Sequence, residues 1–124
     1  MSAVNAVRFE KVDVVFGKNA AQAVALMDRG EGRDSILEKT GSLVAVHDAN
    51  VFVNEGEILV LMGLSGSGKS SLLRCVNGLN KVTRGKVMVH DGQAEVDVAS
   101  CSEDVLRRVR RNRVSMVFQQ FALM

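Results

Sequence analysis

The chain has 124 residues, of which 47% are hydrophobic and 24% charged, and this is the balance of one ordinary globular domain. Five of the sixteen basic residues lie within 105–114 and the remainder of the chain is slightly acidic, so its formal net charge of +2 does not indicate a generally basic protein that coats nucleic acid. Two cysteines without CxxC spacing exclude a disulfide framework, and the N-terminal residues lack the apolar stretch of a secretory signal.

The first part of the chain predicts one strand followed by two helices. Valine-rich alternation over 6–17 predicts a strand, and the alanine-rich segment 19–30 predicts a helix that a glycine stops. A second helix is expected over 34–41, because Ser35 and Glu38 have the spacing of a capping box.

The middle of the chain predicts more strands and another helix. The segment 42–63 reads as two strands separated by a turn at 54–56. The run 58–62 is almost entirely apolar, which is typical of a strand buried on both faces in a parallel sheet. Apolar residues at helical spacing then predict a helix over 68–79.

The last third predicts a hairpin, a helix and a final strand. Two alternating runs over 85–98 flank an Asp-Gly pair, which is a hairpin signal. The segment 102–112 predicts a helix with Ser102 as its N-cap, and 113–124 predicts an apolar strand. The order of these elements predicts a mixed α/β fold.

The stretch GLSGSGKSS (63–71) follows the apolar run 58–62 and fits the pattern G-x-x-x-x-G-K-[ST]. Such a loop wraps its backbone N–H groups around phosphates, and the following helix directs its positive end at the same anion. A dinucleotide fingerprint is disfavoured, because the glycines are spaced G-x-x-G-x-G and a lysine follows. The residues expected to bind a nucleotide are Gly63, Leu64, Ser65, Gly66, Ser67, Gly68, Lys69, Ser70 and Ser71.

Two further candidates each allow a functional and a plain interpretation. Phe16 ends the first predicted strand and is either a platform for stacking adenine or a core residue, and spacing alone favours the core. Gln119 and Gln120 interrupt an apolar segment. They either supply an oxygen to a metal or an attacking water, or they mark an exposed strand end.

Other polar groups favour plain interpretations. Five arginines within 105–114 form either a surface for nucleic acid or a solvated helix face, and the solvated face is favoured. His47 and His90 are isolated, so they are expected to be ordinary strand residues without a metal. Cys75 is expected in the core.

Three segments together resemble a known family. VNEGEILVLMGLSGSGKS, LRRVRRNRVSMVFQQFALM and the helical insert AVALMDRGEGRDSILEKTG are similar to the ATP-binding subunit of ABC transporters. The resemblance is specifically to the group that takes up glycine betaine, proline betaine and choline. It implies an α/β P-loop NTPase fold, with a mixed sheet and an antiparallel β subdomain.

The resemblance also implies a domain organisation. The chain, 1–124, is expected to be the N-terminal part of a nucleotide-binding domain that stops before the helical subdomain. It would contain a helical insert at 19–41, the phosphate loop at 63–71 and a strand of the glutamine loop at 114–124. An apolar face and a strand edge are then expected to be exposed in this chain.

The family assigns roles to individual residues. Phe16 corresponds to the aromatic residue that stacks on adenine, which reverses the preference from spacing alone. Lys69 and Gln119 take the catalytic roles, and Ser70 and Gln119 approach Mg²⁺. The implied cofactors are ATP and Mg²⁺.

The implied function is the import of choline or glycine betaine, powered by ATP hydrolysis in the full-length protein. The implied partners are a membrane-spanning permease, a periplasmic solute-binding protein and a second ATPase subunit, with no nucleic acid. The expected location is the cytoplasmic face of the bacterial inner membrane. The alternative is a nucleotide-binding module without hydrolysis, because this chain contains no signature motif, Walker B strand or switch histidine.

Overall fold

The computed structural model describes residues 4–63 and 68–117, and its described strands form one antiparallel sheet in the order β2-β1-β3-β4. The strands are β1 (Asn5–Phe16), β2 (Leu43–Asn54), β3 (Arg84–His90) and β4 (Glu95–Asp97). The helices are α1 (Ala20–Asp28), α2 (Arg33–Thr40), α3 (Lys69–Val76) and α4 (Glu103–Asn112). No helix among the described residues combines the length and the hydropathy that a bilayer crossing requires.

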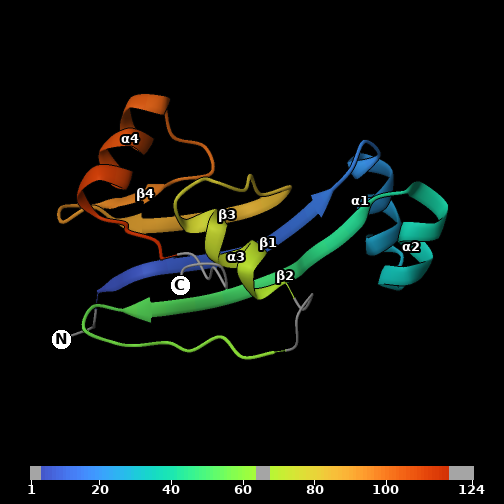
Figure 1. Ribbon diagram of the computed structural model, residues 1–124, viewed down its shortest axis with the longest axis horizontal. Coiled ribbons are helices and arrows are strands. Elements are labelled where there is room, and N and C mark those ends of the chain that lie inside the picture. Colours follow the sequence, from blue (N-terminus) through green and yellow to red (C-terminus); the bar gives the residue numbers. More distant parts are fainter. Residues whose placement is uncertain (1–3, 64–67, 118–124) are drawn as a thin grey trace, which may run out of the picture.

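The long pair β1 and β2 forms the axis of the molecule (Figure 1). Helices α1 and α2 connect these two strands and lie at one end of the pair, whereas α4 lies above the β3–β4 end. Helix α3 lies over the middle of the sheet. The α/β class and the antiparallel part of the predicted sheet are therefore confirmed.

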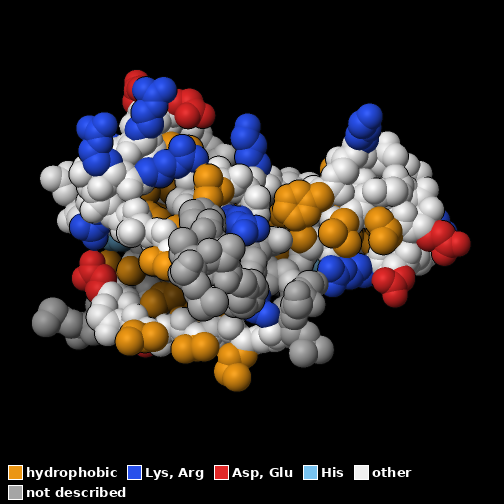
Figure 2. Space-filling model, in the orientation of Figure 1, with side chains coloured by type: hydrophobic (Ala, Val, Ile, Leu, Met, Phe, Trp, Pro, Cys, Tyr) orange, Lys and Arg blue, Asp and Glu red, His pale blue; other side chains and the backbone are white. Residues whose placement is uncertain are grey.

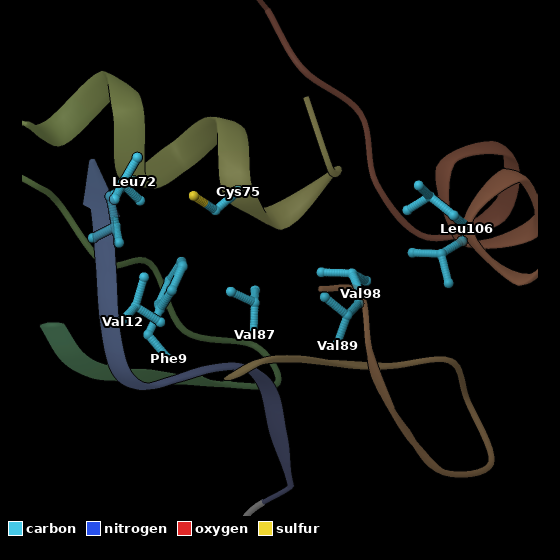
Figure 3. Packing of buried hydrophobic residues seen from close by; sticks show 10 residues of the cluster. Phe9, Val12, Leu72, Cys75, Val87, Val89, Val98 and Leu106 are labelled. Carbon is cyan, nitrogen blue, oxygen red and sulfur yellow. The ribbon is translucent and has the colours of Figure 1, made fainter. Parts of the chain in front are cut away.

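The main core lies between the sheet and helices α3 and α4. Leu72 and Cys75 of α3 face the sheet, and Leu106 of α4 faces β3 and the residues after β4 (Figure 3). Strand residues complete this cluster: Phe9, Val12, Val14, Val87 and Val89. The expected core position of Cys75 is confirmed, and burial raises the pKa of its thiol to about 11.

A second apolar cluster fixes helices α1 and α2 to the sheet. It joins Val15 of β1 and Val44 of β2 to three residues of the two helices, Ala23, Met27 and Ile36. Because side chains alternate along a strand, Val14 enters the main core whereas Val15 enters this second cluster. Strand β1 therefore has apolar cover on both faces near its end.

A buried carboxylate connects three strands and one helix. Asp13 of β1 is only 4% exposed, and its Oδ2 accepts a hydrogen bond from Nε of Arg84 at 2.8 Å. Its Oδ1 accepts from the backbone N–H of Asp48 at 2.8 Å and lies 3.1 Å from Nδ1 of His47. The guanidinium also donates two hydrogen bonds to Asp28 at the end of α1. The bonds to Asp28 are the larger cause, and the bond to Asp13 the smaller one, of a raised pKa of Arg84.

Several predictions of local structure are confirmed. The β3–β4 hairpin turns at Asp91 and Gly92, where the N–H of Asp91 donates to the carbonyl of Ala94 at 2.9 Å. Ser102 caps α4, because its Oγ accepts from the backbone N–H of Val105. The arginines that follow on α4 are exposed, and Figure 2 shows basic side chains over this helix, as the solvated-face interpretation expects.

The predicted capping box at the start of α2 is wrong. The helix begins earlier, with Gly32 as its N-cap in extended conformation, so Ser35 is already inside the first turn. There the Ser35 hydroxyl donates to the Glu31 carboxylate at 3.0 Å. Lys39 donates to the same carboxylate at 2.8 Å. These two groups lower the pKa of Glu31, with Lys39 the larger cause.

The predicted buried strand at 58–62 is also wrong. These residues have no regular secondary structure, and Ile58, Val60 and Met62 are strongly exposed. Figure 2 shows hydrophobic side chains along this edge of the molecule. An apolar strand requires neighbouring strands and covering layers, and none of the described strands pairs with this segment. The expected exposure of an apolar face is thus confirmed for 58–62.

The described beginning of the last predicted strand has no strand structure either. Arg113 lies in a turn and residues 114–117 are irregular, although Val114 packs against the main core. The remainder of that prediction, 118–124, lies outside the described residues.

Two isoleucines test the correction at 58–62. Ile36 is 1% exposed and Ile58 is 93% exposed. We expect Ile36→Ala to lower the free energy of unfolding by about 3 kcal/mol, because it leaves a cavity in the second cluster. Ile58→Ala should change it by less than about 0.5 kcal/mol. Urea denaturation of both variants measures this difference, and equal losses would show that 58–62 is packed.

The buried carboxylate provides a second test. We expect Asp13→Asn to lower the free energy of unfolding by about 2 kcal/mol. The Arg84 guanidinium and the Asp48 N–H donate to different carboxylate oxygens, and the amide replaces one of these oxygens with an NH₂ group that cannot accept. Asp104→Asn is the matched control, since the Asp104 carboxylate is 94% exposed. An Asp13→Asn midpoint in urea as high as that of the control would contradict a stabilising role.

Candidate functional site

The glycine-rich loop lies between the irregular segment 57–63 and helix α3. The structure describes Gly63 on one side of the loop and the residues from Gly68 onward on the other. The predicted helix after the loop is confirmed as α3, which begins at Lys69 and ends at Val76. Four predicted nucleotide-binding residues lie outside the described residues: Leu64, Ser65, Gly66 and Ser67.

Gly68 rests directly on the backbone of strand β2. It has a left-handed φ of 91°, and an ideal Cβ at this position would lie 2.1 Å from the carbonyl oxygen of Ala45. No side chain fits there, and the left-handed conformation itself favours glycine. The end of the loop is therefore pressed against the sheet at one defined point.

The contact point on β2 is a β-bulge. Val14 of β1 pairs with Val46, whereas the next residue, Val15, pairs with Val44. Ala45 is therefore the extra residue of the bulge, which frees it from regular pairing. A bulge bends a strand and redirects its groups, and here the redirected carbonyl meets Gly68.

Helix α3 begins without a side-chain cap. The backbone N–H of Leu72 donates to the carbonyl of Gly68 at 2.9 Å, and this bond closes the first turn of the helix. The amides of Lys69, Ser70 and Ser71 precede this bond, and a glycine N-cap has no side chain to satisfy them. An N-terminus of this kind is suited to an anion such as phosphate.

Lys69 connects the two sides of the loop. Its Nζ donates a hydrogen bond to the carbonyl of Gly63. The ammonium group thereby lies across the loop, where a mobile positive charge can reach an anion bound inside it. Beside it, a cavity of about 300 Å³ opens between β2, residues 61–62 and the start of α3.

The two serines after Lys69 differ in their surroundings. Ser70 is exposed, so its hydroxyl is accessible to a metal ion or a ligand. Ser71 is partly buried, and its carbonyl accepts from Nδ2 of Asn80 at 3.1 Å and from Sγ of Cys75 at 3.3 Å. These bonds hold the first turn of α3 on the fold.

Phe16 is not a core residue, so the preference from spacing alone is wrong. It is 42% exposed at the end of β1, and it pairs with Leu43 at the start of β2. Alternation along β1 places it on the same face as Val14, which is the face that carries α3. The structure therefore brings an accessible aromatic ring to the strand end beside the bulge that holds Gly68.

Gln119 and Gln120 lie outside the described residues, so the roles predicted for them remain predictions. The described residues contain no group of three or more His, Cys, Asp or Glu side chains arranged to hold a metal ion. A magnesium site at Ser70 would accordingly depend on a ligand's own oxygens and on residues outside these ranges.

Sequence reasoning missed the cluster around Asp13. His47 was expected to be an ordinary strand residue, and it does lie in β2, but its Nδ1 contacts the buried Asp13 carboxylate. The partners of this carboxylate come from strands far apart in the sequence, and no local spacing announces them. One signal was available, because Asp13 interrupts a run of valines that is otherwise apolar.

The described residues fit a phosphate-bearing ligand. The site combines a backbone surface that no side chain can occupy at Gly68, the first-turn amides of α3, which no side chain caps, and the Lys69 ammonium. An exposed aromatic ring lies on the same face of the sheet. This arrangement can bind an anion and stack on a base, and it is consistent with a nucleotide.

Comparisons with known proteins agree with this chemistry. The model of the ABC transporter family matches residues 46–124. The chain is 48% identical over 110 residues to the glycine betaine/proline betaine transport ATP-binding protein ProV of Salmonella typhimurium. This match covers 89% of this chain and 26% of ProV. It is also 46% identical over 117 residues to the glycine betaine transport ATP-binding protein OpuAA of Bacillus subtilis, and this match covers 94% of this chain and 27% of OpuAA.

A solved structure has the same fold. It is described as the dimeric post-hydrolysis state of the ATP-binding cassette MJ0796 bound to ADP and Pi. It matches with a TM-score of 0.67 at 26% identity and covers 95% of this chain and 40% of that one. The chain spans about a quarter of the length of the two curated relatives. Because the family model covers more than half of it, the chain belongs to the ABC transporter family, among the ATP-binding proteins.

Proposed function

We propose that this chain is the nucleotide-binding part of a subunit that hydrolyses ATP to power the import of a quaternary amine, either choline or glycine betaine. The observation that carries the proposal is the seating of Gly68 on the Ala45 carbonyl, which directs the start of α3 and Lys69 into the loop. ATP is the ligand whose phosphates this geometry suits.

Binding is proposed to begin at the phosphates. The first-turn amides of α3 and the positive end of its dipole stabilise the negative charge. Lys69 exchanges its bond to the Gly63 carbonyl for bonds to the β- and γ-phosphates. Phe16 stacks on the adenine ring from the end of β1.

Magnesium is proposed to be held by the Ser70 hydroxyl together with the phosphates and Gln119. Ser70 is exposed at the second position of α3, so its hydroxyl can reach an ion at the mouth of the loop. Mg²⁺ prefers oxygen ligands and commonly binds through a substrate's phosphates, where it neutralises charge that develops during transfer.

The transported solute is inferred from which segments align. The family model begins at residue 46, after helices α1 and α2. A match over 110 or more of 124 residues has to include both helices, and the relatives with such matches are named for transport of glycine betaine, proline betaine, carnitine or trimethylamine N-oxide. The α1–α2 insert is therefore the part of this chain that points to methylated amines, and among these relatives those with the highest identity over this length are named for the quaternary amine glycine betaine.

The proposed partners follow from the same relatives. The matching solved structure, that of MJ0796, is dimeric, so we propose that two subunits of this kind act together. The subunit would dock on a permease that spans the inner membrane, on the cytoplasmic face, and a periplasmic binding protein would deliver the solute. Because the compared proteins are longer, these partners belong to the proposed whole protein.

Lys69 provides the first test of nucleotide binding. We expect the chain to bind MgATP weakly, and Lys69→Ala should weaken this binding about tenfold or more, because the phosphates lose a charged donor. Lys81→Ala is the control, since Lys81 is exposed and lies beyond α3. Calorimetric titration with MgATP measures both, and equal affinities would contradict the proposed site.

Cells that carry Lys69→Ala in the whole gene test the transport step. Uptake of labelled choline or glycine betaine should be lost with this substitution. If ATP binding is lost but uptake of both solutes persists, the transport function is wrong. If the whole protein binds MgATP but releases no phosphate, it is the alternative module without hydrolysis.

Gly68 provides a test that does not alter charge. Gly68 and Gly56 both have a left-handed φ, of 91° and 79°, but only Gly68 has backbone within reach of a Cβ. Gly56→Ala should cost about 1 kcal/mol of stability from strain alone and leave MgATP binding unchanged. Gly68→Ala should displace the loop from β2 and abolish binding, and retained binding would show that the contact is dispensable.

A further inference from the structure

The α1–α2 insert leaves and rejoins the sheet through a narrow neck, which consists of Gly17, Asn19, Thr40 and Ser42. Thr40 and Ser42 are buried, whereas Gly17 and Asn19 are exposed. Ser42 is fully buried. An ideal Cβ on Gly17 would lie 2.7 Å from Ser42 Oγ and 3.0 Å from its Cα. The φ of Gly17 is 128°, so this position is closed to other residues by space and by conformation.

The neck is closed by hydrogen bonds rather than by apolar packing alone. Oγ of Ser42 accepts from the backbone N–H of Asn19 at 3.2 Å, and the Asn19 side-chain amide donates to the carbonyl of Thr40 at 2.7 Å. The Thr40 hydroxyl accepts from the N–H of Ser42 at 3.0 Å and donates to the carbonyl of Ile36 at 2.7 Å. Each polar group of Thr40 and Ser42 named here is thus satisfied inside the protein.

The neck adjoins the end of β1 that carries Phe16. Phe16 precedes Gly17, and its partner Leu43 follows Ser42, so Phe16–Leu43 is the last pair of the β1–β2 ladder. Beyond Leu43, β2 reaches the bulge at Ala45, whose carbonyl meets Gly68. A short segment, 42–45, therefore connects the backbone behind the exposed ring to the phosphate loop.

The exposed ring needs support from its backbone. Phe16 is 42% exposed, so packing restrains it less than it restrains a core residue. The direction of the Phe16 ring then depends on the φ and ψ angles at the end of β1, and the neck follows directly after this end. Buried networks of satisfied hydrogen bonds rigidify the segments that they join.

We propose that Ser42 is a positioning residue for the nucleotide base, because it closes the neck and thereby holds Phe16 at a fixed distance from the phosphate loop. This inference rests on the proposed function, since it assigns a task to the insert within the same ATP site. The insert would then affect recognition of the base and leave recognition of the phosphates unchanged.

The test compares two ligands that differ in the base. We expect Ser42→Ala to weaken MgATP binding by roughly fivefold, which is the effect of losing about one stacking contact. Binding of magnesium tripolyphosphate should stay unchanged, because it has no base and the loop remains on β2. A general loss of structure would weaken both ligands, so the comparison separates positioning from folding.

The matched control is Ser35→Ala. Ser35 lies in the insert and its hydroxyl also takes part in a hydrogen bond, which it donates to Glu31, but it is outside the neck. We expect this variant to bind both ligands as the unmodified chain does. Gly17→Ala approaches the neck from the other side, and it should weaken MgATP without affecting tripolyphosphate.

A double variant tests the link to Phe16. In a Phe16→Ala chain, Ser42→Ala should cause no further loss of MgATP affinity, since the ring that it positions is gone. Additive losses, or equal losses for both ligands, would overturn the inference and leave the proposed function intact. If the unmodified chain binds tripolyphosphate but shows no preference for MgATP, the base site itself is absent and both proposals fail.

Discussion

The contact between Gly68 and the Ala45 carbonyl is the constraint on which the rest of the site depends. Because no Cβ fits between them, the end of the phosphate loop and the bulge of β2 form one structural unit. The direction of α3 follows from this contact. Its apolar side, with Leu72 and Cys75, then meets the main core, and its first turn follows directly on Gly68. Packing and ligand chemistry are thus set by the same few atoms.

A charge network performs a similar task on the other side of the sheet. Asp28 ends helix α1, where the negative end of the helix dipole disfavours a carboxylate. Arg84 compensates for it and at the same time neutralises the buried Asp13, so one guanidinium joins β1, β3 and the insert. The apolar cluster around Ile36 holds the insert by burial, whereas this network restricts how the insert is oriented.

Elements with a local signal were predicted well from the sequence. The glycine and lysine at the start of α3, the hairpin turn at Asp91 and the Ser102 cap each depend on neighbouring residues, and each is present. The error at 58–62 has a non-local cause. An apolar run such as 58–62 indicates a preference for burial but does not supply a partner strand, and no described strand pairs with it. Ser35 is not the N-cap of α2, because Gly32 already takes that position.

The closed neck makes the α1–α2 insert a side branch of the sheet. Its two ends meet at the last pair of the ladder, so the register of β1 against β2 is determined without the helices. Residues can be added to or removed from the far end of the branch, around the turn between α1 and α2, without shifting the strands. Length variation among homologous proteins should therefore accumulate there, and the same turn is the place where a reporter domain or a circular permutation would be tolerated.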